Sequence, residues 1–423
     1  MKRFALAVSA LALVAQGLTA HCTMAQDVTI DMVHVQFNPD ELKLMDEIAA
    51  AYHAEHPDVT INVRKFGGEE YKAMLTTSLQ SSEAPDIIYS WGGGVLTDQI
   101  KAGLLRPIDG LVPDKMKTDV GNVGIEAFSH DGKLYGVAQN VSEVVVWYNK
   151  ALFAKAGLDV AGMATWDGFR AGVGKLKAAG VTPIAMGAKD KWPAAFFWDY
   201  LAIRLAGRSG IEAARAGDAN GFTAPEFVRA GDEFLKLSDL APYQNGFEAA
   251  GYASASGMFG DGKAAMILMG DWNVQESKTN SVSKQGVPDD QLGYFPFPSI
   301  DGQKGNVKDT LGGVNGWVFA KDASDEAVKF MVWYQGQENL AKFAAGGYFI
   351  PINPNAAKSL ANPFLQQISQ DIRNSPYHAI FFDQSLGLNA GNAVNEVAAA
   401  LASKVVSASD AAQTVEDAMA LDR

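Results

Sequence analysis

The stretch that decides the fold lies between residues 28 and 89, where short segments of two different periods alternate. In order they are VTIDMVHV (28–35), LKLMDEIAAAY (42–52), VTINV (59–63), YKAMLTTSL (71–79) and DIIY (86–89). The first and third alternate apolar and polar residues and the fifth is a short apolar run, as in strands, whereas the second and fourth repeat apolar residues every three or four positions, as in amphipathic helices. Strand, helix, strand, helix, strand predicts a βαβ series and a parallel, doubly wound α/β sheet.

The same mixture of strands and helices continues downstream. Segments 144–148, 264–268 and 316–320 are expected to be buried strands. Thr165 is expected to cap a helix that Gly180 ends. Helical pattern returns at 325–345 and dominates from residue 363 onward. A chain of 423 residues exceeds what one hydrophobic core usually organises, and no Ser/Pro-rich linker interrupts it, so two interleaved domains are predicted.

Residues 1–25 have the features of a secretory signal peptide. Two basic residues are followed by an uncharged run, 4–14, that is too short to span a bilayer. Thr23-Met24-Ala25 is an acceptable small-x-small exit, so Gln26 is the expected mature start, and cleavage after Ala20 is the alternative. A periplasmic location follows from such a leader.

Cys22 is the only cysteine of the chain and lies within this leader. A lipid-modified cysteine needs a small residue before it, and His21 occupies that place, so lipid anchoring is the less favoured alternative. The mature chain is then expected to lack disulfides and thiol chemistry. Without the leader the formal charge changes from −13 to 33 − 48 = −15, which disfavours nucleic acid and anionic membranes as partners.

Common catalytic and metal motifs are absent or incomplete. His53-x-x-His56 falls on a polar helix end, where a solvated face is the favoured interpretation. The string 257–263 has the spacing of a phosphate-binding loop, but Ala264 stands where a hydroxyl is needed and a strand follows, so a turn entering a strand is expected. The acidic pair 289–290 lies in a Gly/Pro-flanked loop. No metal or cofactor is predicted.

Tryptophans beside turns are the most informative residues for function. Trp91 precedes a run of three glycines after a predicted strand, Trp192 precedes Pro193 and a predicted helix, and Trp272 follows Asp271 after another strand. An indole at a loop edge leaves a large apolar face that a ligand can cover. The other tryptophans considered lie inside apolar elements and are expected in the core: Trp147, Trp317 and Trp333.

Ten short strings, in this order and spacing, resemble the extracellular solute-binding proteins of bacterial ABC importers, family 1, the carbohydrate-binding group. They are APDII (84–88), AGLL (102–105), GKLYG (132–136), YNK (148–150), TW (165–166), MF (258–259), GKAAM (262–266), GDW (270–272), GG (312–313) and GGYFIP (346–351). The resemblance covers essentially the whole mature chain.

The resemblance implies a periplasmic-binding-protein type II fold, in which two doubly wound α/β lobes are joined by three crossover hinge segments. The first lobe is expected to hold 26–140 and 312–355, and the second 141–311 and 356–423. It also implies a monomer that binds a sugar between the lobes, closes on it and is read by the permease subunits of the importer, with no bond made or broken.

The site residues implied by the resemblance come from every part of the mature chain. They are Trp91, Gly92, Asn140, Ser142, Glu143, Trp192, Asp271, Trp272, Gly313, Asn315, Tyr348 and Asp383. Relatives often carry an acidic residue at the place of Ser142, so which of Asn140, Ser142 and Glu143 faces the cleft is left open.

The ligand expected from these residue types is a di- or oligosaccharide. Indoles stack on the apolar face of a pyranose, and carboxylates and amides bind its rim of hydroxyls. Two alternatives are kept. A polyamine would use the acidic and aromatic residues, and a glycosidase would need two carboxylates about 5–10 Å apart, for which Glu143, Asp271 and Asp383 are the candidates.

Overall fold

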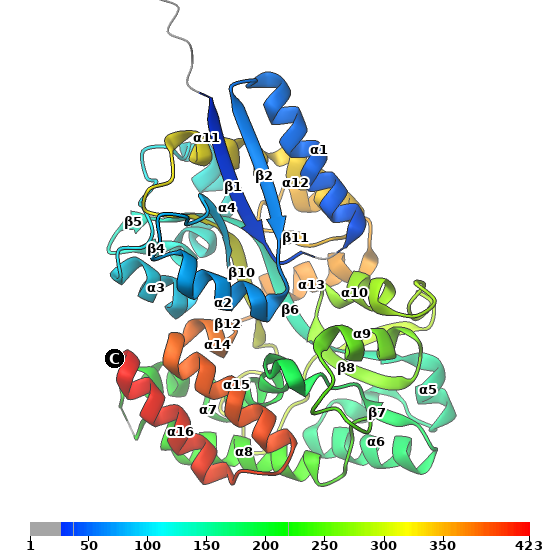
Figure 1. Cartoon of the computed structure of the whole chain (residues 1–423). Coiled ribbons are helices and arrows are strands. Elements are labelled where there is room, and N and C mark those ends of the chain that lie inside the picture. The colour runs from blue at the N-terminus through cyan, green and yellow to red at the C-terminus, as the bar shows by residue number, and fades with distance from the viewer. Residues whose placement is uncertain (1–26, 37, 219) are drawn as a thin grey trace, which may run out of the picture.

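The computed structural model describes residues 27–36, 38–218 and 220–423 (Figure 1). The predicted signal peptide, its cleavage site and Cys22 lie outside these residues. Among the described residues, no helix combines the length and apolar character needed to cross a bilayer.

Residues 28–90 form the predicted βαβ series. They contain β1 (Val28–His34), α1 (Pro39–Glu55), β2 (Val59–Lys65), α2 (Gly68–Ser78) and β3 (Ile87–Ser90). Strands β2 and β3 pair with β1 on either side, both parallel to it. The prediction of a parallel sheet is confirmed for this segment.

Two long strands change the sheet from parallel to mixed. β10 (Thr310–Phe319) pairs antiparallel with β3 and with β6 (Gly136–Asn149), so the prediction of a parallel sheet is wrong for these pairs. Residues 144–149 of β6 pair antiparallel with β8 (Ala264–Gly270) and β9 (Leu292–Phe295), and β7 (Thr182–Ile184) lies parallel to β8. β6 therefore runs from one half of the molecule into the other.

Buried apolar residues form two clusters, one in each half of the molecule. The first draws on residues 30–138 and 314–356, and the second on 144–311 and 360–419, with Ala344 and Ile350 added. Val141, in the middle of β6, packs against both. We call the parts around these clusters the first lobe and the second lobe; they are the upper and lower halves of Figure 1.

Further helices cover the sheets of both lobes. The first lobe contains α3 (Gly93–Lys101), α4 (Asp114–Ala127), α11 (Asp325–Tyr334) and α12 (Gln337–Gly346). The helices of the second lobe are α5 (Lys150–Lys155), α6 (Trp166–Ala178), α7 (Trp192–Ala216), α8 (Pro225–Ser238), α9 (Tyr252–Gly260), α10 (Asn273–Asn280), α13 (Pro363–Asn374), α14 (Phe382–Ser385), α15 (Leu388–Ala402) and α16 (Ala408–Asp422). Short strands complete the fold: β4 (Ser129–His130), β5 (Lys133–Leu134), β11 (Ile350–Pro351) and β12 (His378–Ile380).

Several local predictions can be checked directly. Thr165 caps α6, with its Oγ accepting from the Gly168 N–H at 3.1 Å, and Gly180 follows the helix at φ +68°. Trp192 and Pro193 do not precede a helix as expected, because they form the first turn of α7. The string 257–263 is helical up to Gly260 and only then turns into β8. The core assignment of Trp147 and Trp317 is confirmed, since both are fully buried.

Candidate ligand-binding site

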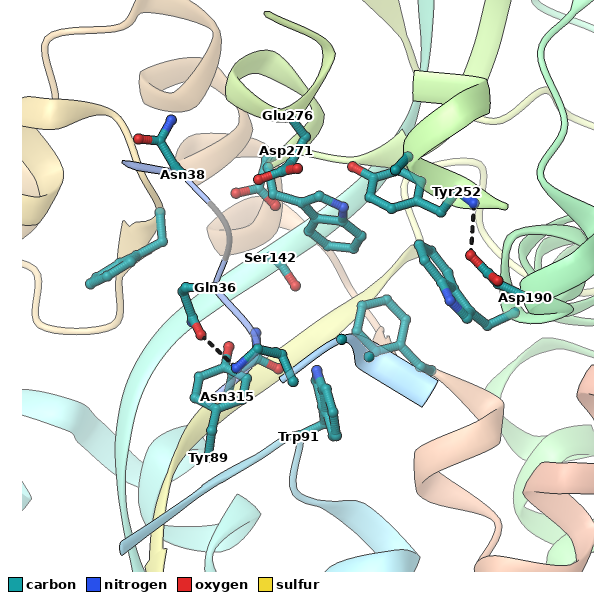
Figure 2. A pocket seen from close by; sticks show the side chains of 18 of the residues that line it. Gln36, Asn38, Tyr89, Trp91, Ser142, Asp190, Tyr252, Asp271, Glu276 and Asn315 are labelled. Atoms are coloured by element: carbon teal, nitrogen blue, oxygen red, sulfur yellow. Dashed lines mark hydrogen bonds between the residues drawn. The ribbon is translucent and has the colours of Figure 1, made fainter. Parts of the chain in front are cut away.

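A cavity of about 520 Å³ lies between the two lobes. The first lobe contributes the β1–α1 junction, the start of α2, the end of β3 and parts of β6 and β10. The second lobe contributes the starts of α7, α9 and α10 and residues 381–384. Figure 2 shows Tyr89 and Trp91 on one side of it, with Tyr252 and Asp271 on the opposite side.

Strand β6 resolves which of three polar residues faces the cavity. Asn140 and Ser142 line it, whereas Glu143 does not, because successive side chains of a strand point to opposite faces. Burial, followed by the charges of Asp371 and Asp271, raises the pKa of the Glu143 carboxyl well above its usual range. Of the three candidates, Asn140 and Ser142 therefore face the cavity, and the implied cleft position of Glu143 is wrong.

Asp271 and Trp272 follow β8 and line the cavity together. The Asp271 carboxylate accepts from the Glu143 N–H at 3.0 Å, and the Asp271 N–H donates to the Glu143 carbonyl at 3.0 Å. Burial raises the pKa of Asp271 to about 7, although the backbone N–H groups that donate to its carboxylate, that of Glu143 among them, favour the charged form. The half-buried Trp272 indole meets Phe381 edge to face, with ring centres 6.1 Å apart.

Trp192 lies at the second-lobe wall with its indole half-buried. It packs beside Tyr252, with ring centres 5.0 Å apart, and edge to face with Phe196 at 5.4 Å. Asp190 holds this corner in place, because its Oδ2 accepts from the Tyr252 N–H at 2.7 Å (Figure 2). The corner offers an apolar surface with a carboxylate beside it.

Trp91 provides the aromatic residue of the first-lobe wall. Its ring meets Tyr71 and Tyr89 edge to face, each at 5.7 Å between centres, so its direction is set by the core of that lobe. Gly92 does not line this cavity but a neighbouring one, because the chain turns away into α3 at φ +69°.

The remaining predicted residues come from three separated segments. Asn315, Tyr348 and Asp383 line the cavity, and the buried Asn315 Oδ1 has no hydrogen-bond partner among the described residues. Gly313 does not line it, because its N–H donates to the Ser142 hydroxyl at 3.0 Å within the sheet. The expected cleft positions of Gly92 and Gly313 are thus wrong for this cavity.

Several lining residues were not predicted from the sequence. They are Val35, Gln36, Asn38, Glu41, Lys72, Tyr89, Asp190, Phe196, Tyr252, Gln275, Glu276, Asn280, Phe349, Phe381 and Gln384, among others. One local signal was available: Asn38 precedes Pro39 as a helix cap does, and its Oδ1 accepts from the N–H groups of Asp40 and Glu41. This cap places Glu41 in the first turn of α1, buried against the cavity.

The cavity holds buried carboxyl groups from both lobes. Burial, and then the charge of Glu276, raises the pKa of Glu41 well above its usual range. Burial likewise raises the pKa of Glu276. Both carboxyl groups are therefore harder to ionise than exposed ones, and a carboxyl in its protonated form donates as well as accepts hydrogen bonds.

Three polar contacts join the lobes around the cavity. Lys72 Nζ on α2 lies 3.5 Å from Asp383 Oδ2. The Gln275 amide donates to the Gly346 carbonyl at 3.2 Å, and the Asn38 amide to the Thr279 hydroxyl at 3.5 Å. Within the described part of the chain, no group of three or more His, Cys, Asp or Glu residues is suited to hold a metal ion.

The chain resembles known proteins over most of its length. It is 29% identical over 290 residues to an uncharacterised ABC transporter extracellular-binding protein of Pyrococcus horikoshii. The matched region covers 67% of this chain and 64% of the relative, so the chain spans less than two thirds of that relative.

Solved structures share its fold. One, from work on xylan utilisation by Caldanaerobius polysaccharolyticus, has a TM-score of 0.85 at 23% identity and covers 92% of this chain and 99% of that one. A chitin oligosaccharide binding protein has a TM-score of 0.83 at 22% identity, covering 93% and 98%. The predicted type II fold with two α/β lobes is confirmed. The family model described as "Bacterial extracellular solute-binding protein" matches residues 38–341, so the chain belongs to this family.

Proposed function

We propose that the protein is the substrate-binding component of an ABC sugar importer and that it binds a di- or oligosaccharide in the cavity between its lobes. The observation that carries the proposal is the arrangement of three half-buried indoles, Trp91, Trp192 and Trp272, around a polar floor. The floor is made by Asn140, Ser142 and Asn315, which are all buried.

The chemistry of a sugar matches this arrangement. Its C–H faces stack on indoles, and its hydroxyl groups both donate and accept hydrogen bonds. The buried Asn315 Oδ1 and Tyr252 hydroxyl have no partners among the described residues, so a ligand hydroxyl can pair with each of them. A buried polar atom without a partner costs about 1–3 kcal/mol, so pairing these atoms favours a polyol over an apolar ligand.

A cationic solute such as a polyamine is the second candidate, because the cavity lining is rich in carboxyl groups. Among the described lining residues, one lysine, Lys72, faces seven acidic side chains: Glu41, Glu69, Glu70, Asp190, Asp271, Glu276 and Asp383. Burial raises the pKa of three of them, Glu41, Asp271 and Glu276, and Lys72 balances a fourth, Asp383. The effective charge is therefore smaller than the count implies, which favours the neutral sugar.

Delivery follows from the two-lobed fold. A ligand that contacts both lobes stabilises the closed arrangement of the lobes. The permease of the importer recognises the protein in this closed conformation. We expect a periplasmic or extracellular monomer that releases its sugar unchanged.

A thermal-shift screen tests the proposal. The mature chain is melted with mono-, di- and trisaccharides, with xylo- and chito-oligosaccharides, and with putrescine and spermidine. A sugar that binds the folded state raises the melting temperature, and the shift grows with the logarithm of the sugar concentration once this exceeds Kd. A shift with the polyamines alone supports the second candidate, and chromatography that finds cleaved oligosaccharide after incubation would support a glycosidase.

A further inference from the structure

A second cavity of about 500 Å³ lies directly beside the first one, between α2 and α3 of the first lobe and α14 and α15 of the second. The two cavities share six lining residues: Glu69, Lys72, Tyr89, Trp91, Asp383 and Gln384. They are therefore neighbouring compartments of one interlobe space. Nothing in the site described above uses the second one.

The Lys72–Asp383 ion pair stands where the two cavities meet. Its side chains are 32% and 12% exposed, and Lys72 also lies 3.3 Å from Glu69. Burial lowers the pKa of Lys72, but the carboxylates of Asp383 and Glu69 outweigh this and raise it, so the ammonium group stays charged. A ligand that extends from one cavity into the other therefore meets a hydrogen-bond donor, Lys72, on one side and an acceptor, Asp383, on the other.

Asn395 gives the second cavity an unsatisfied polar group. Its side chain lines the cavity, the residue is 8% exposed, and its Nδ2 donates to Asp383 Oδ2 at 3.2 Å. Its Oδ1 is buried and has no partner among the described residues. Such an oxygen gains a hydrogen bond only when a donor, such as the hydroxyl group of a ligand, enters the cavity.

The rest of the lining is dominated by neutral polar and apolar side chains. The neutral polar members are Thr76, Gln80, Ser90, Gln99, Gln384 and Asn392. Trp91 borders both cavities, so a sugar ring stacked on it lies at the passage between them. Amides and hydroxyls around an aromatic residue suit the hydroxyl rim of a further sugar ring better than they suit a charged solute.

We propose that the second cavity is an additional sugar subsite, which receives the end of an oligosaccharide too long for the first cavity. The inference rests on the proposed function. Lys72, Asp383 and Asn395 bind hydroxyl groups at the passage, and the length of the chain that both cavities hold sets the preferred ligand.

A matched pair of variants tests this subsite. Thr76 and Thr77 are adjacent exposed residues of α2, both with hydroxyls bonded to helix carbonyls, but only Thr76 lines the cavity. Thr76→Trp fills it and Thr77→Trp does not. Calorimetric titration uses the wild type and both variants with xylo-, chito- and manno-oligosaccharides of one to six units.

The expected result is a wild-type affinity that rises with chain length beyond the chains that fill the first cavity. Thr76→Trp should lower the affinity for the longest bound oligosaccharide by about 10-fold, the scale of one lost stacking ring, and should not change the affinity for short oligosaccharides. Thr77→Trp should bind all lengths as the wild type does. Asn395→Ala should weaken long chains by about 2- to 10-fold, as for one lost hydrogen bond. The control Asn389→Ala, on the same helix but bonded to Asp422 outside both cavities, should have no effect.

Equal affinities of long chains for Thr76→Trp and Thr77→Trp would overturn the additional subsite while leaving the proposed function standing. The same holds if the wild type gains no affinity once the first cavity is filled. Binding of none of the three series by the wild type would overturn both.

Discussion

At the scale of single residues, Gly270 determines where the Trp272 indole can lie. A Cβ at position 270 would lie 1.9 Å from Cζ3 of the Trp272 ring, so only glycine allows the indole to lie back over the end of β8. The ring then keeps one edge on Phe381 and stays half-exposed to the cavity. Gly270 and Phe381 thus set the position of this stacking surface.

Trp272→Ala should therefore reduce sugar affinity far more than it reduces stability. We expect a loss of about 1–3 kcal/mol in binding, the scale of aromatic stacking, measured by calorimetric titration. The denaturant midpoint without ligand should change little. The control Trp147→Ala removes a fully buried indole whose Nε1 donates to the Met269 carbonyl at 3.1 Å, and it should cost about 3–5 kcal/mol of stability. A large loss of stability in Trp272→Ala with unchanged affinity would contradict the role of Trp272 as a stacking surface for the sugar.

Asp271 should make the free energy of unfolding depend on pH. Its pKa is 3.8 when unperturbed and about 7 in the folded protein, so between these values the folded state holds a proton that the unfolded state releases. Stability should therefore fall as pH rises from about 4 to about 7, by roughly 4 kcal/mol for this group. Asp271→Asn keeps an oxygen that can accept from the Glu143 N–H, and it should flatten the dependence.

The measurement is denaturant unfolding across this pH range for both proteins. Glu41 and Glu143 also have raised pKa values and act in the same direction, so some slope should remain in the variant. Identical slopes for wild type and Asp271→Asn would show that the Asp271 carboxyl does not hold its proton in the folded state.

At the scale of elements, the start of α3 packs directly on α14 across the lobe boundary. A Cβ at Gly94 would lie 2.5 Å from the Gly387 nitrogen and 2.8 Å from the Ser385 carbonyl oxygen. The glycine run that follows Trp91 therefore serves close approach between the lobes.

Gly94→Ala should weaken ligand binding by keeping the lobes apart. Gly94 does not have a positive φ, so alanine brings no backbone strain, and the new methyl group acts only by its volume. A cost of 1–2 kcal/mol to the closed state corresponds to about 5- to 30-fold in apparent affinity. Gly110→Ala is the matched control, because its Cβ would meet no atom within 4 Å. Equal affinities of the two variants, by titration, would exclude this contact from closure.

Strand β10 shows why element boundaries were harder to predict than element types. The apolar run 316–320 predicted its second half, but the strand begins at Thr310. Gly312 and Gly313 carry no strand propensity in sequence. They are needed because a Cβ at Gly312 would lie 1.7 Å from the Ser142 carbonyl oxygen of β6. This requirement comes from the neighbouring strand and leaves no local periodicity.

At the scale of the whole molecule, the polar contacts between the lobes predict a change of shape on binding. Lys72–Asp383 and Gln275–Gly346 hold the lobes together around the cavity, but an exposed or partly exposed pair contributes only about 0–1 kcal/mol. Closure therefore depends on the ligand. Small-angle scattering should give a smaller radius of gyration with saturating sugar than without it, and an unchanged radius would contradict closure of the two lobes.

The amino-acid sequence by itself determined the local elements and the kind of protein. Periodicity predicted β1, α1, β2, α2 and β3, because the spacing of apolar residues in an amphipathic segment shows which face is buried. The ordered short strings predicted the family and, through it, Trp91, Trp192, Asp271 and Trp272 as lining residues, each next to a turn that the local sequence makes visible.

Only the tertiary structure decided which polar groups meet in the cavity. The pleat of β6, set by its pairing with β10, directs Asn140 and Ser142 into the cavity and Glu143 away from it. Glu41 and Glu276 stand far apart in the chain, yet folding brings them to opposite walls of one buried space. Desolvation raises the pKa of both carboxyl groups, and the charge of Glu276 raises that of Glu41 further. Both effects depend on distances through space that the spacing along the chain does not give.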